Sequence, residues 1–531
     1  MKVRITNLAA DLDDNRALEE IAASRLKVGA EKIRRVKLVR KAVDARRYHG
    51  AGIKFNYIVD VEVAGKVRLG GGVTEILAEN IFPRVAVPKS FAQKNPIVIG
   101  FGPAGMFAAL ELARAGLEPI IFERGGDVDA RTAAVAKFFR TGELDENSNV
   151  QFGEGGAGTF SDGKLTTRLD DPLTGCVLKT FVEAGAPEEI SYLQKPHIGT
   201  DKLRGVVKNI RAEILRLGGK IFFNAQVTDF EFDAGRNVTA AIVNGSEKFP
   251  AGAVFLGVGH SARDTYEMLN RHGLAMETKA FAVGVRIEHA QEFINRAQYG
   301  EDFASPKLPA ADYFLTFKGK TRGAYSFCMC PGGQVVAAAS ETGGVVTNGM
   351  SNFARSSGVA NSAILVTVDA GDFKNFGGDV LSGVRFQRHL ETLAFKLGGG
   401  NFKAPVQSVG DFLNARAGSQ NFAVKPTYPL GFKIADMNEI LPAEVAETLK
   451  DALNFWNGRI KNFAAEDIPL TGVETRTSAP CRILRDKVTR QSLSHGGIFP
   501  IGEGAGYAGG IMSSAVDGVK SARNLLTQAA R

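Results

Sequence analysis

Cysteine is scarce in this chain, with 4 in 531 residues. So few cysteines exclude a disulfide framework and are typical of a reducing compartment. No apolar run reaches the roughly 18 residues of a membrane span, and the first residues, MKVRITNLAADLDD, lack the apolar core of a signal peptide. With 44% apolar and 23% charged residues, the composition is that of an ordinary folded protein. We therefore expect a cytoplasmic protein with no membrane partner.

Most of the chain carries no net charge. Residues 1–94 hold 19 Lys and Arg against 11 Asp and Glu, whereas the remainder holds 46 of each, so the whole net charge of +8 lies in the first part. This asymmetry predicts a separate basic N-terminal domain, residues 1–90, with a linker near 86–95. Its pattern predicts a ferredoxin-like α+β fold from a strand, a helix and two strands, over 2–8, 15–26, 33–44 and 54–63.

The basic residues of this domain cluster next to Tyr48 and His49. They are Arg34, Arg35, Lys37, Arg40, Lys41, Arg46 and Arg47. Such clusters bind phosphates or acidic surfaces, and they also occur as ordinary solvated faces. Three interpretations stay open: a docking site for a small acidic electron carrier, a nucleic-acid surface, and a solvated face.

A dinucleotide fingerprint follows the linker, in PIVIGFGPAGMFAALELARAGLEPIIFERGG, residues 96–126. A strand at 97–99 leads into Gly100, Gly102 and Gly105, then a helix, and then a strand that ends at Glu123. In this motif the first glycine makes a tight turn, the second lets the backbone approach a pyrophosphate, and the third lets the helix pack closely. The helix N-terminus attracts phosphate, and the terminal acid accepts from the ribose.

Two further glycine-rich segments accompany the fingerprint. FGEGGAGTFSDGKL, residues 152–165, predicts a loop that presses its main chain against a flat ring or a phosphate. IFPIGEGAG, residues 498–506, resembles the last segment of the FAD domain in glutathione-reductase-like flavoproteins, with Glu503 in place of the more usual Asp. The weaker segment GVGHS, residues 257–261, fits a strand that passes near the flavin, and His260 is equally well explained as a residue at a helix start.

Residues 276–470 have a different pattern, with mixed strands and helices and no second strand–GxGxxG–helix unit. The fold class that we predict is α/β: a two-part Rossmann-like FAD-binding domain (91–275 and 471–531), an inserted α+β substrate domain (276–470), and the small N-terminal domain. Helices are expected at 200–217, 262–272, 380–397, 442–463 and 512–528.

The motifs together resemble the bacterial family of FAD-dependent, or NAD(FAD)-utilising, dehydrogenases of unknown substrate. The segments that carry this resemblance are IGFGPAGMFAAL, GEGGAGTFSDGKL, GHSARDTY, FCMCPGG, GVETRTSAPCRI and GEGAGYAGGI. The resemblance implies bound FAD and an oxidoreductase role. The predicted FAD-binding residues are Gly100, Gly102, Pro103, Ala104, Gly105, Glu123, Arg124, Gly155, Gly156, Thr159, Ser161, Asp162, Gly163, Lys164, Gly259, Gly502, Glu503, Gly510 and Ile511.

Four residues are candidates for catalysis. Cys328 and Cys330 are either redox thiols that exchange electrons with flavin, half of a metal site, or small apolar residues of a buried strand. A metal site is the poorest of these, because only two other cysteines remain, and we assign no metal. Arg476 is a candidate anchor for an anionic substrate, and Glu474 a candidate base if burial raises its pKa. An inter-domain salt bridge is the alternative for both.

The function predicted from the sequence is a FAD-dependent oxidoreductase that moves a hydride or two electrons through flavin N5 to or from a small molecule. Because there is no second dinucleotide motif, NAD(P)H is expected to dock only transiently in the substrate cleft. Two alternatives remain: a nucleic-acid-associated flavoprotein, and a non-catalytic FAD scaffold or redox sensor.

Overall fold

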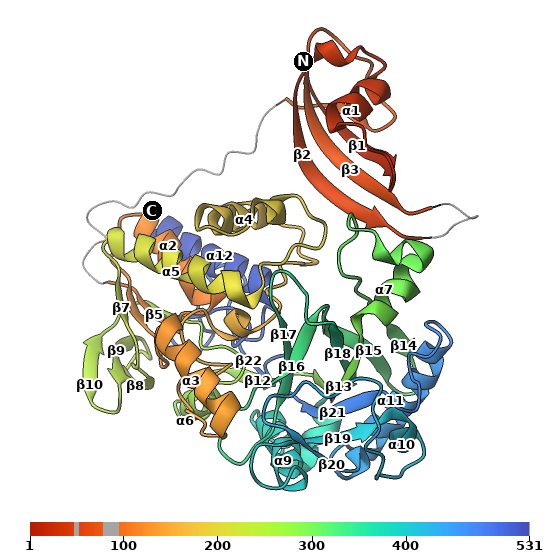
Figure 1. Ribbon diagram of the computed structural model, residues 1–531. Coiled ribbons are helices and arrows are strands. Elements are labelled where there is room, and N and C mark those ends of the chain that lie inside the picture. The colour runs from red at the N-terminus through yellow and green to blue at the C-terminus, as the bar shows by residue number, and fades with distance from the viewer. Residues whose placement is uncertain (47–51, 78–94, 530–531) are drawn as a thin grey trace.

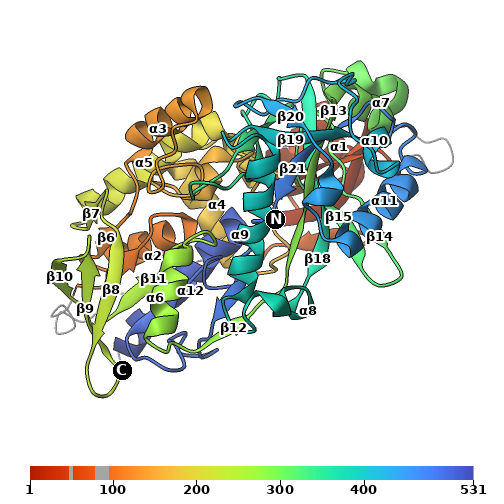
Figure 2. The ribbon, with the colours of Figure 1, turned by 90° about the horizontal axis from the view of Figure 1, so that it is seen from below.

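The computed structural model describes residues 1–46, 52–77 and 95–529 (Figure 1). The predicted linker, apart from Asn95, lies outside the described residues, as do Arg47, Tyr48 and His49 of the basic cluster. The predicted domain boundaries at residues 90, 275 and 470 stay predictions. Three layered regions are visible: a small sheet at the N-terminus, a parallel sheet flanked by helices, and a larger mixed sheet (Figures 1 and 2).

The N-terminal region is an antiparallel sheet of order β2-β3-β1-β4 with one helix packed on it. Its elements are β1 (Lys2–Asp11), α1 (Leu18–Leu26), β2 (Ile33–Asp44), β3 (Lys54–Val63) and β4 (Val73–Glu75). The ferredoxin-like prediction is incomplete, because no second helix lies between β3 and β4 in the described chain. Residues 64–72 are too short a connection, and they turn at four positive-φ glycines, Gly65, Gly70, Gly71 and Gly72.

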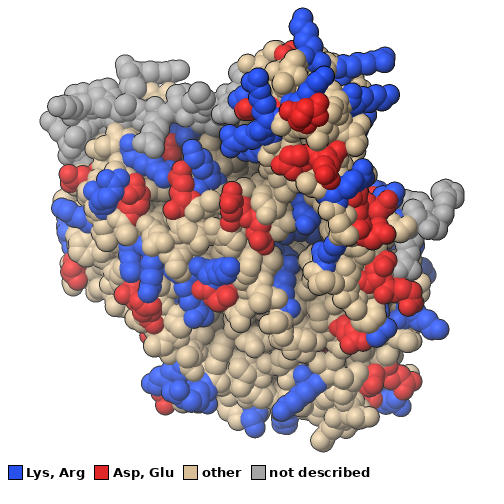
Figure 3. Space-filling model, turned by 45° about the horizontal axis from the view of Figure 1, so that its top comes forward, with Lys and Arg blue, Asp and Glu red and all other residues tan. Residues whose placement is uncertain are grey.

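Four of the basic side chains on β2, those of Arg34, Arg35, Lys37 and Arg40, are exposed, and Figure 3 shows the mixed blue and red surface of this region. β2 is an edge strand, and near its end Lys41 forms a parallel bridge with Leu193. The Lys41 N–H donates to Tyr192 O at 2.7 Å, and the Gln194 N–H donates to Lys41 O at 2.9 Å. The small sheet is thus joined to the rest of the molecule through backbone hydrogen bonds.

The predicted dinucleotide region is a five-stranded parallel sheet of order β23-β11-β5-β6-β7. Its strands are β5 (Ile97–Ile99), β6 (Ile120–Phe122), β7 (Lys220–Phe222), β11 (Val254–Leu256) and β23 (Ile498–Pro500). Both faces are buried, as in parallel sheets generally. Val98, Ile121 and Phe255 pack under the helices, whereas Ile97 and Leu256 point to the other core.

Helices cover one face of this sheet and a small antiparallel sheet covers the other (Figure 1). The helices are α2 (Pro103–Arg114), α4 (Leu173–Glu183), α5 (Thr200–Arg216) and α12 (Ile511–Ala529), and the strands are β8 (Val227–Phe232), β9 (Val238–Val243) and β10 (Glu247–Pro250). β23 and α12, from the C-terminal end of the chain, complete the layer that β5 and α2 begin.

The third region is a seven-stranded sheet of order β14-β15-β18-β13-β21-β19-β20. Its strands are β13 (Phe281–Ala290), β14 (Thr316–Lys318), β15 (Gly323–Cys330), β18 (Val359–Val368), β19 (Ala404–Ser408), β20 (Phe432–Ile434) and β21 (Pro469–Glu474). On β13, Val283, Val285 and Ile287 face the core that α11 (Ala443–Asn457) closes, so Arg286 and Glu288 point to the opposite face. The predicted helix 442–463 is shorter than expected because Gly458 ends it.

The remaining elements connect or cover these layers. They are α3 (Val128–Thr141), α6 (Arg263–Arg271), α7 (Gln291–Tyr299), α8 (Ala370–Phe373), α9 (Ser382–Leu397), α10 (Val409–Leu413), β12 (Met276–Thr278), β16 (Gly333–Ala337), β17 (Thr347–Ser351) and β22 (Cys481–Ile483). Figure 2 shows α9 between the parallel-sheet half and the seven-stranded half. None of the helices in the described ranges is long and apolar enough to cross a membrane.

Candidate functional site

A cavity of about 340 Å³ lies between the parallel sheet and the seven-stranded sheet. This volume is in the range of small-molecule and cofactor sites. The residues that follow the carboxyl ends of the parallel strands line it, including Gly100, Glu123 and Gly257, which is where open α/β sheets bind ligands. Of the predicted FAD-binding residues, those on its wall are Gly100, Gly102, Pro103, Ala104, Glu123, Arg124, Gly156, Ser161, Asp162, Lys164, Gly259, Glu503, Gly510 and Ile511.

Five predicted residues lie outside this lining: Gly105, Gly155, Thr159, Gly163 and Gly502. Three of them shape the wall from behind. A Cβ on Gly105 would lie 1.9 Å from Gly100 O, one on Gly502 would lie 2.6 Å from the Ala104 Cβ, and one on Gly163 would lie 2.9 Å from Gly199 N. Close packing between backbones therefore explains these glycines.

Two glycine segments meet directly at the cavity. Gly100 has φ 87°, which favours glycine, and begins the turn into α2. A Cβ on Gly156 would lie 2.9 Å from the Gly102 Cα, so the loop of residues 152–165 approaches the fingerprint through main chain alone. The wall that results is formed largely by backbone.

Helices α2 and α12 both begin at the cavity, with Gly102, Pro103 and Ala104 from one and Gly510 and Ile511 from the other on its wall. Helix N-termini offer unpaired N–H groups and a positive dipole end to anions. Two such ends in one cavity suit a ligand with phosphates and a ring that gains negative charge.

Glu503 stands beside the α12 end and accepts from the Gly510 N–H at 3.3 Å. Burial raises the pKa of Glu503 to about 7. Gln151 also lines the cavity, and its buried Oε1 has no hydrogen-bond partner among the described residues. A glycine cradle, two helix ends and a free polar atom fit a dinucleotide with a flavin ring.

Glu123 lies on the cavity wall with both carboxylate oxygens already bonded. It accepts from the N–H groups of Phe101 at 2.8 Å, Gly125 at 3.0 Å and Gly153 at 3.0 Å. The carboxylate thus ties the two glycine segments together. Its predicted contact with a ribose stays a prediction.

The glycine loop is held by Arg131 of α3, which sequence reasoning missed. This fully buried guanidinium donates to the carbonyl oxygens of Asn149, Val150, Gly153, Glu154 and Gly156, at 2.7 to 3.2 Å. Burial lowers the pKa of Arg131 to about 9. The loop backbone is therefore fixed by one side chain.

Asp162 and Lys164 contact the inserted region. Asp162 accepts from Ser351, and from Arg355 Nη2 at 2.6 Å, while Lys164 donates to Met329 O. Burial alone would raise the pKa of Asp162, but Lys164 and Arg355 hold it well below its usual range. Both residues still line the cavity, at the junction of its two walls.

The facing wall comes from the seven-stranded sheet and is built of charged side chains. Arg286 on β13 donates from Nε and Nη2 to the two oxygens of Glu474 on β21, at 2.5 and 3.0 Å. Two further bonds, to Asn361 and Asn348 at 2.9 Å each, fix the guanidinium. Burial raises the pKa of Glu474 to about 7 although Arg286 favours the carboxylate. An isolated charge in an apolar strand, as in FAVGVRIEHA, is the signal that could have revealed Arg286.

Cys328 lines the cavity and Cys330 is buried behind it. Cys328 has φ 43°, an uncommon conformation for a residue with a Cβ that costs about 1 kcal/mol. A hydrogen bond from Cys330, together with Lys164 and Arg286, lowers the pKa of Cys328 to about 5, and the same hydrogen bond raises that of Cys330. Among the described residues, no group of three His, Cys, Asp or Glu is placed to hold a metal.

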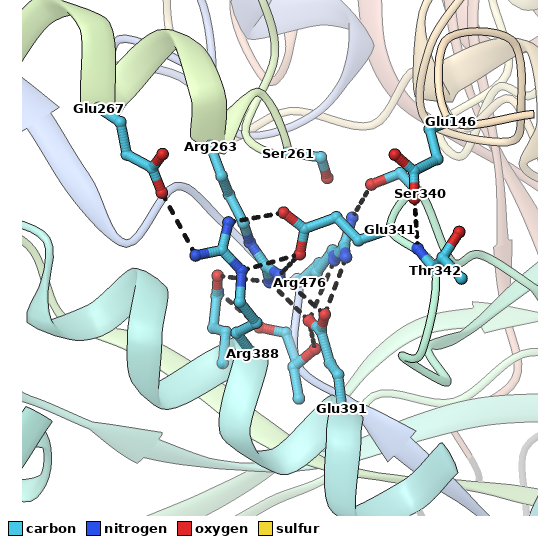
Figure 4. Close-up of polar contacts among 12 residues, drawn as sticks. Glu146, Ser261, Arg263, Glu267, Ser340, Glu341, Thr342, Arg388, Glu391 and Arg476 are labelled. Atoms are coloured by element: carbon cyan, nitrogen blue, oxygen red, sulfur yellow. Dashed lines mark hydrogen bonds and ion pairs between the residues drawn. The ribbon is translucent and has the colours of Figure 1, made fainter. Parts of the chain in front are cut away.

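Arg476 forms a buried ion pair instead of standing free (Figure 4). It donates from Nε and Nη2 to Glu391 of α9, at 3.1 and 2.8 Å. Arg263 of α6 donates to the same carboxylate at 2.9 and 2.6 Å, so Glu391 joins the parallel-sheet half to the inserted half. The salt-bridge alternative therefore describes Arg476, and burial lowers the pKa of its guanidinium.

The rim of this network includes Glu341, which pairs with both Arg263 and Arg388. Burial would raise the pKa of Glu391, but Arg263 and Arg476 hold it well below its usual range. His260, on the cavity wall, has its pKa lowered to about 3 by burial and by Arg476 and Arg263, so its ring is neutral at pH 7. Its side chain lies 3.0 Å from the Ser261 hydroxyl.

Comparison with known proteins shows first which families the chain resembles. Residues 280–477 match the family model "FAD-dependent protein, C-terminal domain-like", and residues 2–62 match "Domain of unknown function (DUF8436)". An uncharacterised protein of Clostridium beijerinckii is 49% identical over 533 residues, which is 99% of each chain. The chain belongs to the same family as this protein.

Solved structures with a similar trace include FAD enzymes. The protein CtdE in complex with FAD shares 14% identity over 82% of this chain and 84% of its own, with a TM-score of 0.33. Glycine oxidase from Geobacillus kaustophilus shares 11% over 82% and 95%, with a TM-score of 0.35. Glycerol-3-phosphate dehydrogenase from Bacillus halodurans, complexed with FAD, shares 12% over 82% and 64%, with a TM-score of 0.34. At these scores no reaction or substrate is carried over.

Proposed function

We propose that this chain is a FAD-dependent oxidoreductase that moves a hydride or two electrons between flavin and a small molecule. The observation that carries the proposal is a cavity with two unlike walls. One wall offers glycine backbone and the starts of α2 and α12, and the other offers Glu474 and Cys328. When bound, FAD would supply the two-electron chemistry at its N5 position.

The residues of the chain have distinct parts in this proposal. Gly100, Gly102 and the α2 end hold the pyrophosphate, and the α12 end stabilises negative charge on the reduced ring. Glu474, with a pKa of about 7, takes or gives a proton at the substrate. Arg476 positions the two halves of the cavity through Glu391.

The test is anaerobic spectroscopy of the purified chain with NADH, NADPH and dithionite. A yellow protein that one nicotinamide bleaches within seconds, and that a metabolite reoxidises, is the expected result. Bleaching by dithionite alone, with no turnover on any metabolite, would favour a scaffold or sensor. A colourless protein that does not take up added FAD would refute the proposal.

A further inference from the structure

The two cysteines of β15 are not used by the hydride transfer proposed above. They lie where the pairing of β15 with β18 slips: Phe327 pairs with Ala363, but Cys330 pairs with Asn361. This slip inserts one extra residue, a β-bulge, and bulges often re-aim side chains next to active sites. Cys330 Sγ lies 3.2 Å from the carbonyl oxygen of Cys328. The bulge thus places the Cys330 thiol against the Cys328 backbone, and the two side chains lie within hydrogen-bond reach of each other.

Two cations surround this short segment. Arg286 Nη1 donates to Cys328 O at 3.1 Å, and Lys164 Nζ donates to Met329 O. Positive charge favours the thiolate of the nearer cysteine. The pKa shifts of the two thiols are consistent with this: the pKa of Cys328 is lowered and that of Cys330 is raised. One sulfur is therefore a nucleophile and the other a protonated neighbour.

The two sulfurs also differ in access. Cys328 lines the same cavity as Glu503 and the α12 end, whereas Cys330 is 0% exposed. A resolving thiol needs no access to solvent, because it attacks only the sulfur of its partner. The arrangement has a nucleophile at the cavity and a resolving thiol directly behind it.

We propose that Cys328 and Cys330 form a redox pair that passes two electrons from the flavin to a disulfide substrate; this rests on the proposed function. The Cys328 thiolate attacks the substrate RSSR, forming a mixed disulfide and releasing RS⁻. Cys330 then attacks the Cys328 sulfur, releases the second RS⁻ and forms the Cys328–Cys330 disulfide. One RS⁻ takes the Cys330 proton and the other takes a proton from solvent.

The pair returns to its starting state by accepting two electrons and two protons from reduced FAD. The Cys328–Cys330 bond breaks, the Cys330 thiol and the Cys328 thiolate re-form, with one proton released to solvent, and FADH₂ becomes FAD. The sum is RSSR + FADH₂ → 2 RSH + FAD, so atoms and electrons balance. Both small disulfides and protein disulfides have this chemistry.

The first experiment is an anaerobic dithionite titration of the yellow protein after mild oxidation. We expect four electrons per FAD in the native chain, and two in Cys328→Ser and in Cys330→Ser. Cys176→Ser, on α4 and away from the cavity wall, is the matched control and should keep four. A native chain that takes two electrons, with both thiols still open to alkylation after oxidation, would overturn the pair.

The second experiment uses mass spectrometry and needs no turnover. Native protein treated with oxidised glutathione should lose two hydrogens from the peptide with Cys328 and Cys330, and Cys330→Ser should instead trap glutathione on Cys328. Absence of both products would contradict the proposal, even if a variant folds poorly, because the native chain is itself measured.

Two substrates then separate the sources of the disulfide. With reduced flavin, oxidised glutathione represents a small disulfide and insulin a protein disulfide. Faster reduction of either by the native chain than by Cys328→Ser supports the proposal and names the source, and reduction of neither overturns the substrate class. A colourless protein would sink the proposed function, whereas a yellow protein with a two-electron titration sinks only the redox pair.

Discussion

The two walls of the cavity are built by different means. The wall from the parallel-sheet half is backbone, held open by Gly100, Gly102 and Gly156 and by two helix ends. The facing wall includes the side chains of Glu474 and Arg476, which are paired with the buried Arg286 and Glu391, respectively, behind them. Backbone donors suit any ligand with phosphates and a flat ring. Paired side chains differ in charge and shape from one protein to another, so we expect this second wall to decide which reaction follows.

The difference also has an energetic side. A wall of glycines costs conformational entropy on folding, because glycine is the most flexible residue in the unfolded chain, and it costs little else. Buried charges lose hydration, and each must find a partner with good geometry. The side-chain wall therefore fails when one partner is lost, whereas the backbone wall fails when a side chain is added. Four substitutions and one matched control follow from this contrast.

The largest effect is expected for Glu391→Gln. It leaves the buried guanidinium of Arg476 without an ion-pair partner and that of Arg263 with Glu341 alone, and we expect a loss of about 3–5 kcal/mol in the free energy of unfolding. Urea denaturation measures it. Because the folded pKa of Glu391 lies below the unfolded one, the native contribution is present above about pH 4.3 and lost as the pH falls.

Glu292→Gln is the matched control for Glu391→Gln. Its ion pair with Arg296 joins residues one helical turn apart, and the side chains of Arg296 and Glu292 are 57% and 64% exposed, respectively. We expect less than about 0.5 kcal/mol there. Equal losses of unfolding free energy at the two sites would show that the buried network stabilises the fold no more than an exposed ion pair does.

An intermediate effect is expected at Gly105 and a selective one at Gly102. A Cβ at Gly105 would meet Gly100 O at 1.9 Å, so Gly105→Ala should cost about 1–3 kcal/mol by overpacking. The atoms nearest to a Cβ at Gly102 are the Gly156 Cα, at an ordinary 3.5 Å, and the Gly156 N, at 3.9 Å. We therefore expect Gly102→Val to fold as stably as the native chain without FAD and yet to lose FAD, because its side chain enters the pyrophosphate position.

Thermal unfolding measures the loss of stability in Gly105→Ala, and flavin absorbance measures the loss of FAD in Gly102→Val. Gly105→Ala should lower the melting temperature, and Gly102→Val should be colourless and melt at the temperature of the native chain stripped of FAD, because bound FAD itself stabilises the fold. A yellow, fully loaded Gly102→Val would refute the placement of the cofactor.

The smallest effect is a pH dependence at Glu474. Burial raises its folded pKa to about 7, above the unfolded value of about 4.3, so its contribution to stability is full at low pH and lost as the pH rises through 7. Glu474→Gln should reduce the fall in unfolding free energy between about pH 6 and pH 7 by about 1 kcal/mol. Denaturation at a series of pH values measures it, and an unchanged slope would contradict the raised pKa.

Sequence reasoning worked best where the signal is local. The strand at 97–99 and the strands at 33–44 and 54–63 have the predicted bounds. Helix α5 differs from its prediction by one residue at one end, and α12 by one residue at each end. It missed α3 for a physical reason: the buried stripe of that helix includes Arg131, a residue type that patterning assigns to solvent. For Arg476 it left a substrate anchor and an inter-domain salt bridge open, because the partner Glu391 lies 85 residues away in the sequence.

The amino-acid sequence alone determined the glycine wall and the basic N-terminal region. Positive φ, close backbone approach and helix starts are demands on consecutive residues, and these are written within a few positions of one another. The tertiary structure decided the pairing of Glu391 with two arginines, the Arg286–Glu474 pair and the meeting of Cys328 with Cys330. Ion pairs between distant segments, and a bulge, depend on strand register and on which faces pack together, and both are settled only when the whole chain buries its apolar surface.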